Sequence, residues 1–306
     1  MKNVHLDEAA TIFFNRELEV IEATIYEIDF PMLQFSNGNI FPIDTSDNPG
    51  AKVTTYQQIE KIGKHKIISN NAKDLPRSTV RGQEFSQSVV SVAGSYGFTF
   101  NDIRAAQFAN KPLDAMLAAA DREADMQALN SLGAFGDNQY GVLGLFNHPD
   151  IPKGSVPNDG PGTEWVNKTS TQILRDMTDC TSEIVQNTLQ VIAPDTMLLP
   201  IAQYDLIANK DSGFGNGQTI LNFFLANNQY VKNILPVNEL KGAGTGGVDV
   251  MVVYSRNSFN AKFKMPMPYT TYPAQAQGLE MLIPTESRWG GLTVYKPLSI
   301  NICEGI

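Results

Sequence analysis

The sequence of 306 residues predicts an α+β fold, and three observations lead to this prediction. Segments with high strand propensity lie near both ends of the chain. One long helical pattern, at about 112–133, separates them. Shorter helical and strand-like segments then alternate between residues 169 and 255. Strands and helices therefore do not alternate along the whole chain, and we expect layers that are discontinuous in sequence.

The first third of the chain predicts a short helix, a hairpin and a long strand. Apolar residues recur every three or four positions over 18–28, which predicts an amphipathic helix that ends near Pro31. Residues 51–69 mix β-branched and polar residues around Gly63, which predicts two antiparallel strands. Neither face of this hairpin is apolar enough to build a core, so it needs another surface to lie on. Residues 85–100 predict one long strand.

Helical elements dominate the middle of the chain. The long pattern starts at Pro112, which suits a first helical turn, and closes at Gly133. Thr169 and Gln172 form a capping-box pattern that starts a second helix, and Cys180 lies on its apolar side. The remaining elements are a strand at 196–200, a helix at 201–210, a helix at 218–228, a strand at 248–255 and extended segments from Phe259 onward.

Composition disfavours several classes of protein. A net charge of −9 and a pI near 4.9 argue against a protein whose main task is to grip phosphate backbones. No apolar run approaches the ~18 residues of a membrane span, and no signal peptide is visible. The two cysteines, Cys180 and Cys303, cannot form a disulfide framework or a zinc site by themselves. Charged residues are only 18% of the chain, which indicates that partners cover much of its surface.

The sequence lacks the patterns that carry catalysis, so we expect no catalytic residue, cofactor or metal site. Gly242, Gly244 and Gly247 match G-x-G-x-x-G formally, but a strand pattern follows them where a dinucleotide site needs a helix. The histidines His5, His65 and His148 belong to no metal-binding pattern. Neither a G-x-S-x-G elbow nor a phosphate-binding P-loop occurs.

Charge is divided unevenly along the chain. Residues 1–50 hold two basic residues against nine carboxylates, a net charge of −7, whereas residues 51–84 hold seven against three, a net charge of +4. We expect the basic segment to meet acidic surface of another subunit. Its candidate contact residues are Lys61, Lys64, Lys66, Arg77 and Arg81, and the candidate acidic residues on the long helix are Asp114, Asp121, Glu123 and Asp125. The ordinary alternative for the acidic residues is a solvated helix face.

The order of these parts resembles the major capsid proteins of tailed bacteriophages, the Hong Kong 97-like fold. The specific branch that it resembles is a capsid family long catalogued only as of unknown function. The segments that carry the resemblance include RELEVIEATIYEIDFP (16–31), GAKVTTYQQIEKIGKHKIISNNAKDLP (50–76), LDAMLAAADREADMQALNSLGAFG (113–136), YGVLGLFNHPDI (140–151), DTMLLPIAQYDLI (195–207) and PYTTYPAQAQGLEMLIPTESRWGGLTVYKPLSI (268–300). Together they cover most of the chain.

The resemblance implies a division of the chain into four parts. These are an N-arm at 1–48, an extended loop (E-loop) at 49–84, a peripheral domain at 85–162 and 259–299 with the spine helix at about 112–133, and an axial domain at 163–258 and 300–306. Some relatives carry a leading helical scaffolding segment that this sequence lacks, which implies a separate scaffolding protein or a processed form. Some relatives also cross-link an E-loop lysine to a neighbour, and Lys61, Lys64 and Lys66 would be the candidate donors; solvated lysines are the ordinary alternative.

The function that the resemblance implies is structural. The chain would self-assemble as hexamers and pentamers into an icosahedral head in the virion, formed in the host bacterial cytoplasm. The head would enclose phage DNA without sequence-specific binding, with no membrane, and with separate scaffolding, portal or decoration proteins. Two alternatives stay open: an encapsulin-like nanocompartment shell around an enzyme cargo, and an α+β enzyme that uses a nucleotide at the 242–247 loop.

Overall fold

The computed structural model describes residues 32–67, 75–109, 113–160, 162–215 and 217–306. The helix expected before Pro31 lies outside these residues. The helices are α1 (Phe100–Ala109), α2 (Leu113–Phe135), α3 (Ser170–Asn187), α4 (Ile201–Asn209) and α5 (Ile220–Asn227). The strands are β1 (Ile43–Asp44), β2 (Val53–Ile62), β3 (Thr79–Ser88), β4 (Val90–Thr99), β5 (Lys153–Ser155), β6 (Thr196–Leu199), β7 (Asn233–Pro236), β8 (Val250–Tyr254), β9 (Ala261–Lys264), β10 (Met267–Thr271), β11 (Gln275–Gln277), β12 (Glu280–Trp289), β13 (Gly291–Val294) and β14 (Ile300–Glu304).

A five-stranded mixed sheet, in the order β5-β14-β8-β6-β7, divides the hydrophobic core into two layers. Successive residues of a strand point to opposite faces, and β8 shows this directly. Val250, Val252 and Tyr254 belong to one core cluster, and Met251 and Val253 belong to the other. The first cluster also holds aromatic residues of the segment before β1, and the second holds the apolar sides of α3, α4 and α5. Burial on both faces explains why β8 is a continuous apolar run.

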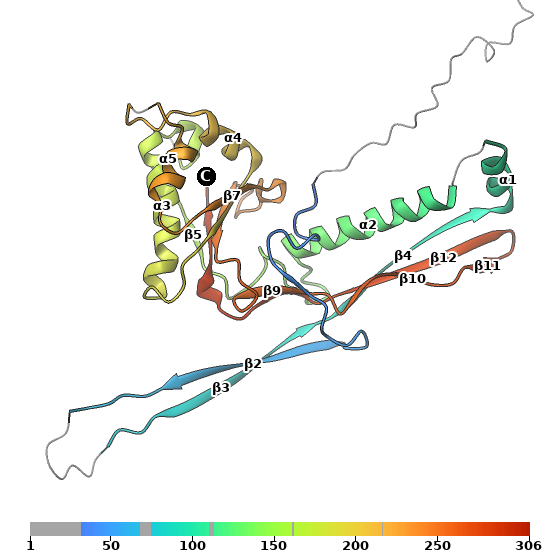
Figure 1. Ribbon diagram of the computed structural model, residues 1–306, viewed down its shortest axis with the longest axis horizontal. Helices are drawn as coiled ribbons and strands as arrows, with labels where there is room; N and C mark the ends of the chain where they lie inside the picture. The colour runs from blue at the N-terminus through green and yellow to red at the C-terminus, as the bar shows by residue number, and fades with distance from the viewer. Residues whose placement is uncertain (1–31, 68–74, 110–112, 161, 216) are drawn as a thin grey trace, which may run out of the picture. The chain divides into compact units, whose positions relative to one another are not determined.

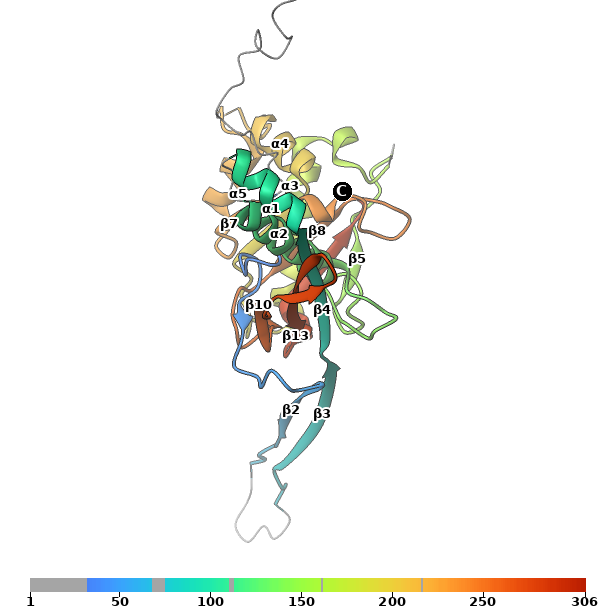
Figure 2. The same cartoon turned by 90° about the vertical axis from the view of Figure 1, so that its right-hand side faces the viewer.

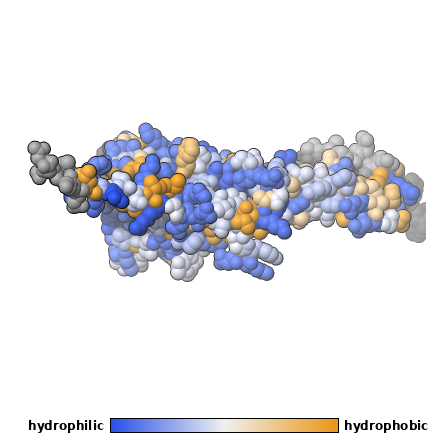
Figure 3. All heavy atoms as spheres, turned by 90° about the horizontal axis from the view of Figure 1, so that it is seen from below, coloured by the Kyte–Doolittle hydropathy of each residue, from blue (hydrophilic) through white to orange (hydrophobic). Residues whose placement is uncertain are grey.

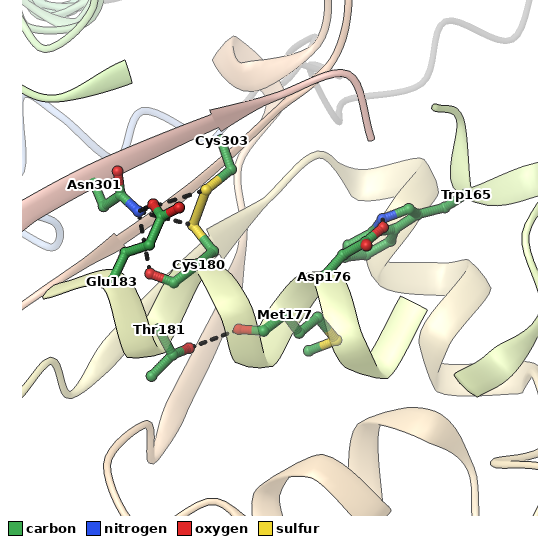
Figure 4. The surroundings of a disulfide bond; sticks show 8 residues. All are labelled: Trp165, Asp176, Met177, Cys180, Thr181, Glu183, Asn301 and Cys303. Atoms are coloured by element: carbon green, nitrogen blue, oxygen red, sulfur yellow. Dashed lines mark hydrogen bonds between the residues drawn. A yellow bond between two sulfur atoms is a disulfide. The ribbon is translucent and has the colours of Figure 1, made fainter. Parts of the chain in front are cut away.

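Helix α3 begins as its sequence predicts. The Thr169 side chain accepts a hydrogen bond from the backbone N–H of Gln172, and the Gln172 side chain accepts one from the backbone N–H of Thr169. The same helix buries Cys180, which forms a disulfide bond with Cys303 of β14 (Figure 4). The sequence predicted no disulfide framework and did not indicate this single bond, because the fold brings together two residues that are 123 positions apart.

A buried ion-pair network holds the loop before α3. The Lys168 ammonium donates to the Asp176 carboxylate over 2.6 Å and to the backbone carbonyl of Pro157 over 2.8 Å. Arg175 donates to the other oxygen of Asp176 over 2.8 Å and also binds Asp159. Lys168 and Asp176 are almost fully buried, so each charge depends on the other for compensation.

A second sheet carries the long helix. Strand β12 pairs antiparallel with β4 over ten residues, from Glu280 opposite Thr99 to Trp289 opposite Val90, and its other edge pairs with β10 and β11. Helix α2 lies along β4 in both views (Figures 1 and 2). The prediction of a long helix at about 112–133 is confirmed, since α2 spans Leu113–Phe135. None of the helices in the described residues is long and apolar enough to cross a membrane.

Strands β2 and β3 form a separate two-stranded sheet. The expected hairpin turned at Gly63 within 51–69, but β2 pairs instead with residues 79–88 across a longer connection. The strand expected at 85–100 is divided between β3 and β4, which meet at the buried Val89. The Val89 backbone N–H bonds to the carbonyl of Lys52, so this point is fixed to the start of the hairpin.

The segment before β1 is part of the core. Phe35, Ile40 and Phe41 are fully buried, and the Tyr254 hydroxyl donates to the carbonyl of Ile40 over 2.9 Å. Strand β1 then pairs parallel with β9. The described part of the predicted N-arm, 1–48, therefore does not behave as a free arm. Likewise β5, which lies in the predicted peripheral segment, pairs with β14 of the five-stranded sheet.

Candidate inter-subunit surface

The register of the hairpin assigns its side chains to two faces. Residues directly opposite each other share a face, so Val53, Ile59, Val80 and Gly82 lie on one side, which we call the apolar face of the hairpin. The same side also carries Thr55, Gln57, Lys61, Glu84, Ser86 and Ser88. The three apolar side chains are 53%, 60% and 63% exposed, respectively. Gly82, opposite Ile59, has no atom within 4 Å of the position where a Cβ would lie, which leaves open space beside Ile59. Exposed apolar residues that share one face indicate a contact surface.

The opposite face of the hairpin anchors it to the rest of the chain. Tyr56 and Phe85 stack with ring centroids 5.3 Å apart, and Tyr295 meets Tyr56 edge-on at 5.0 Å. The buried Gln87 donates to the carbonyl of Leu292 over 3.1 Å. These contacts lie at the start of β2 and the end of β3, so the far half of the hairpin gains no burial from them.

The basic residues selected from the sequence lie in the far half of the hairpin. Lys61 is opposite Val80 and shares the apolar face, whereas Arg81 is opposite Glu60 on the other face. Lys64 and Lys66 follow the end of β2, and Arg77 precedes β3. All five are exposed, so the structure keeps their charges together at one end of the ribbon.

The acidic residues selected on α2 do not form one surface. Asp114 is exposed, but Asp121 accepts hydrogen bonds from the hydroxyls of Tyr269 and Thr285, at 2.8 and 2.7 Å. Asp125 accepts one from Ser287 over 2.6 Å. Burial raises the pKa of Asp125, against the hydrogen bond from Ser287, which lowers it. Glu123 is half-buried.

The interpretation of Asp121 and Asp125 as a solvated face is therefore wrong, because both carboxylates face strands of their own chain. The reason is that β12 presents hydroxyls of Thr285 and Ser287 toward α2, and the helix supplies the acceptors. Gly94 of β4 lies beneath the same contact, since a Cβ there would come within 2.9 Å of an Asp121 oxygen. Of the four candidates for contact with another subunit, Asp121 and Asp125 thus also bind within their own chain.

The other side of this sheet faces away from α2 and carries small residues. Because Thr285 and Ser287 point toward α2, the alternate residues of β4 and β12 point the other way. On β4 these are Ser91, Ala93, Ser95 and Gly97, and on β12 they are Glu280, Leu282, Pro284, Glu286 and Arg288. Hydrogen bonds from Ser91 and Tyr272 lower the pKa of Glu286, which keeps it ionised. We call this surface the helix-free face of the β4–β12 sheet.

The glycine-rich loop at 242–247 lacks the strand–turn–helix arrangement of a dinucleotide site. The loop with Gly242, Gly244 and Gly247 precedes β8 rather than a helix, and its Gly242 N–H bonds to the Asp249 carboxylate over 2.8 Å. Among the described residues, no group of three or more His, Cys, Asp or Glu side chains is arranged to hold a metal ion.

Hydrophobic patches on the face drawn in Figure 3 are interspersed with hydrophilic surface.

The fold is that of bacteriophage capsid proteins. The capsid chain of the myovirus phage XM1 superposes with a TM-score of 0.82 at 18% identity, over 96% of this chain and 99% of that one. A chain of Mycobacterium phage Adephagia gives a TM-score of 0.64 at 13% identity, over 99% of this chain and 97% of that one. A chain of an empty GTA particle capsid gives 0.64 at 11% identity, over 94% of each chain. No curated protein sequence matches the chain.

The family model for the major capsid protein matches residues 63–306, so the chain belongs to the major capsid protein family. The protein is a structural subunit of an oligomeric capsid shell and part of a virion, and it is not an enzyme. The resemblance seen in the sequence is thereby confirmed, and neither the nanocompartment nor the nucleotide-using enzyme is favoured.

Proposed function

We propose that this protein forms the icosahedral head of a tailed bacteriophage, as hexamers and pentamers that enclose DNA and assemble in the host cytoplasm. In this proposal residues 49–84 are the E-loop, α2 is the spine helix of a peripheral domain at 85–162 and 259–299, and 163–258 with 300–306 form the axial domain. Residues 1–48 supply the N-arm. Scaffolding, portal and decoration proteins would be separate chains.

The observation that carries the proposal is the incomplete burial of the hairpin. Its base is anchored by Tyr56 and Phe85, while Ile59 and Val80 remain largely exposed in the far half. A two-stranded ribbon is marginal by itself, so it gains stability when a second copy covers it. The lysines at the far end of the hairpin would contact acidic residues of that second copy.

The helix-free face of the β4–β12 sheet is the surface that suits this hairpin best. The small side chains of β4 leave room for Ile59 and Val80. Glu280 and Glu286 outnumber Arg288 on this face and would attract Lys61. This face adds acidic residues to the candidates Asp121 and Asp125, each of which has one carboxylate oxygen hydrogen-bonded within its own chain. Exposed ion pairs contribute only ~0.2–1 kcal/mol each, so we expect the charges to set register and association rate.

The test is a charge reversal at the end of the hairpin. Lys61→Glu with Lys64→Glu should impair shell assembly and leave the subunit folded, as measured by light scattering and circular dichroism on the same samples. Lys232→Glu with Lys241→Glu makes the same charge change at exposed positions elsewhere and should assemble normally. Electron microscopy of the wild-type protein should show closed shells. Normal assembly of the hairpin variant at both low and high salt would refute the docking role.

A further inference from the structure

The disulfide Cys180–Cys303 joins two layers of the fold. Cys180 lies in the middle of α3, and Cys303 lies on β14, which is paired on both sides within the five-stranded sheet. Their Cα atoms are 6.4 Å apart, a separation that a disulfide spans without backbone movement. These are the two cysteines of the chain, so the bond has no competing partner within a subunit.

The surroundings of the sulfurs make thiol exchange slow (Figure 4). Cys180 and Cys303 are only 2% and 6% exposed. The side-chain amide of Asn301 contacts both sulfurs, at 3.5 and 3.6 Å, and donates to the Glu183 carboxylate over 2.6 Å. Burial and a neighbouring negative charge both disfavour the thiolate, which is the species that exchanges or is oxidised. The pair should therefore change its oxidation state slowly, over the storage of a particle rather than during assembly.

We propose that this pair is a late oxidation site: the chain folds and assembles as a dithiol, and the bond forms in released particles. The inference rests on the proposed assembly in a bacterial cytoplasm, where thiols are kept reduced. Outside the cell, dissolved oxygen is the oxidant. The two S–H bonds break and one S–S bond forms, and the two protons and two electrons reduce O₂ to hydrogen peroxide.

The consequence of the bond is a covalent link between the helical layer and the last strand. The loop that it closes contains β6, α4, α5 and β8, and with them most of the core behind α3. A cross-link between residues far apart in sequence destabilises the unfolded chain more than a short one does. The bond therefore makes the mature shell harder to unfold, while the contacts between subunits need not change.

The experiment counts thiols before and after release. Producing cells are quenched in acid, denatured and treated with N-ethylmaleimide, and the intact mass of the chain is measured. We expect two maleimides attached to each chain from quenched cells and none attached to chains from particles stored in air. After those particles are reduced in denaturant, their chains should also take up two. No maleimide in quenched cells, or two in aged particles, would overturn the proposal.

A variant separates the role of the bond from that of the shell. Cys180→Ser with Cys303→Ser should assemble with normal yield, and its thermal midpoint should not respond to reductant, whereas that of aged wild-type particles should fall. Equal midpoints for oxidised and reduced wild-type particles would remove the stabilising role. Failure of the wild-type protein to form shells would instead refute the proposed function, and the thiol count in quenched cells does not depend on assembly.

Discussion

Replacing the exposed apolar residues of the hairpin should disrupt assembly more than an equal charge change on its other face. The perturbation is Ile59→Asp with Val80→Asp, two side chains on the apolar face that are 60% and 63% exposed. Full burial of such a side chain gives roughly 1.5–3 kcal/mol, so covering the exposed part gives about 1–2 kcal/mol each and ~2–4 kcal/mol for the pair. Loss of this free energy raises the dissociation constant of each contact about 30-fold or more.

The matched control places the same two charges on the opposite face. Gln58→Asp with Gln83→Asp alters exposed residues that are directly opposite each other in the ladder. Light scattering follows assembly, and circular dichroism should report a folded subunit for both variants, since neither pair is buried in the isolated chain. We expect assembly to fail for the first variant and to persist for the second. Equal behaviour of the two variants would refute the assignment of the docking face.

Three further predictions concern the stability of the subunit itself. Lys168→Met leaves the buried Asp176 without one of its two cations and should cost about 3 kcal/mol in urea denaturation, most of which a second change, Asp176→Leu, should restore; an unchanged midpoint would contradict this. Thr169→Ala removes the cap of α3 and should cost ~1 kcal/mol, whereas Thr169→Ser should cost much less. Burial alone would raise the pKa of Asp44, but hydrogen bonds from Lys262 and Lys264 outweigh it and hold that pKa well below its usual value. The stabilisation is therefore present above about pH 4 and is lost as the pH falls further, so the thermal midpoints of wild type and Asp44→Asn should converge in acid; a constant difference down to pH 2 would contradict this.

Local patterns predicted α2, α3, α4 and α5, but they did not indicate α1. Such patterns depend on residues within one or two turns of each other, so a single sequence shows them. Examples are the capping box at Thr169 and Gln172 and the length of α2. Strand β8 was equally clear, because burial on both faces leaves a continuous apolar run.

Pairings between distant segments could not be predicted in the same way. Gly63 marks a plausible turn, but the partner of β2 begins at Thr79, and nothing near Gly63 indicates that distance. The roles of Asp121 and Asp125 depend on hydroxyls of β12, more than 160 residues further on, so helical periodicity alone suggested a solvated face. For the candidate surface, the sequence indicated the basic residues correctly as exposed, but the two-face arrangement emerged only from the register.

The hairpin leaves the β4–β12 sheet at Val89 and extends beyond its anchored base. Strands β3 and β4 are separated by this one residue, yet β3 belongs to the hairpin ladder and β4 to the ladder with β12. The contacts of Tyr56 and Gln87 hold the base of the hairpin, so it bends beyond them. The five residues from Tyr56 to Lys61 measure about 17 Å, and a bend of ~10° there moves Lys61 by about 3 Å. In the proposed shell, subunits of identical sequence would in this way meet neighbours at different angles with little rearrangement of their cores.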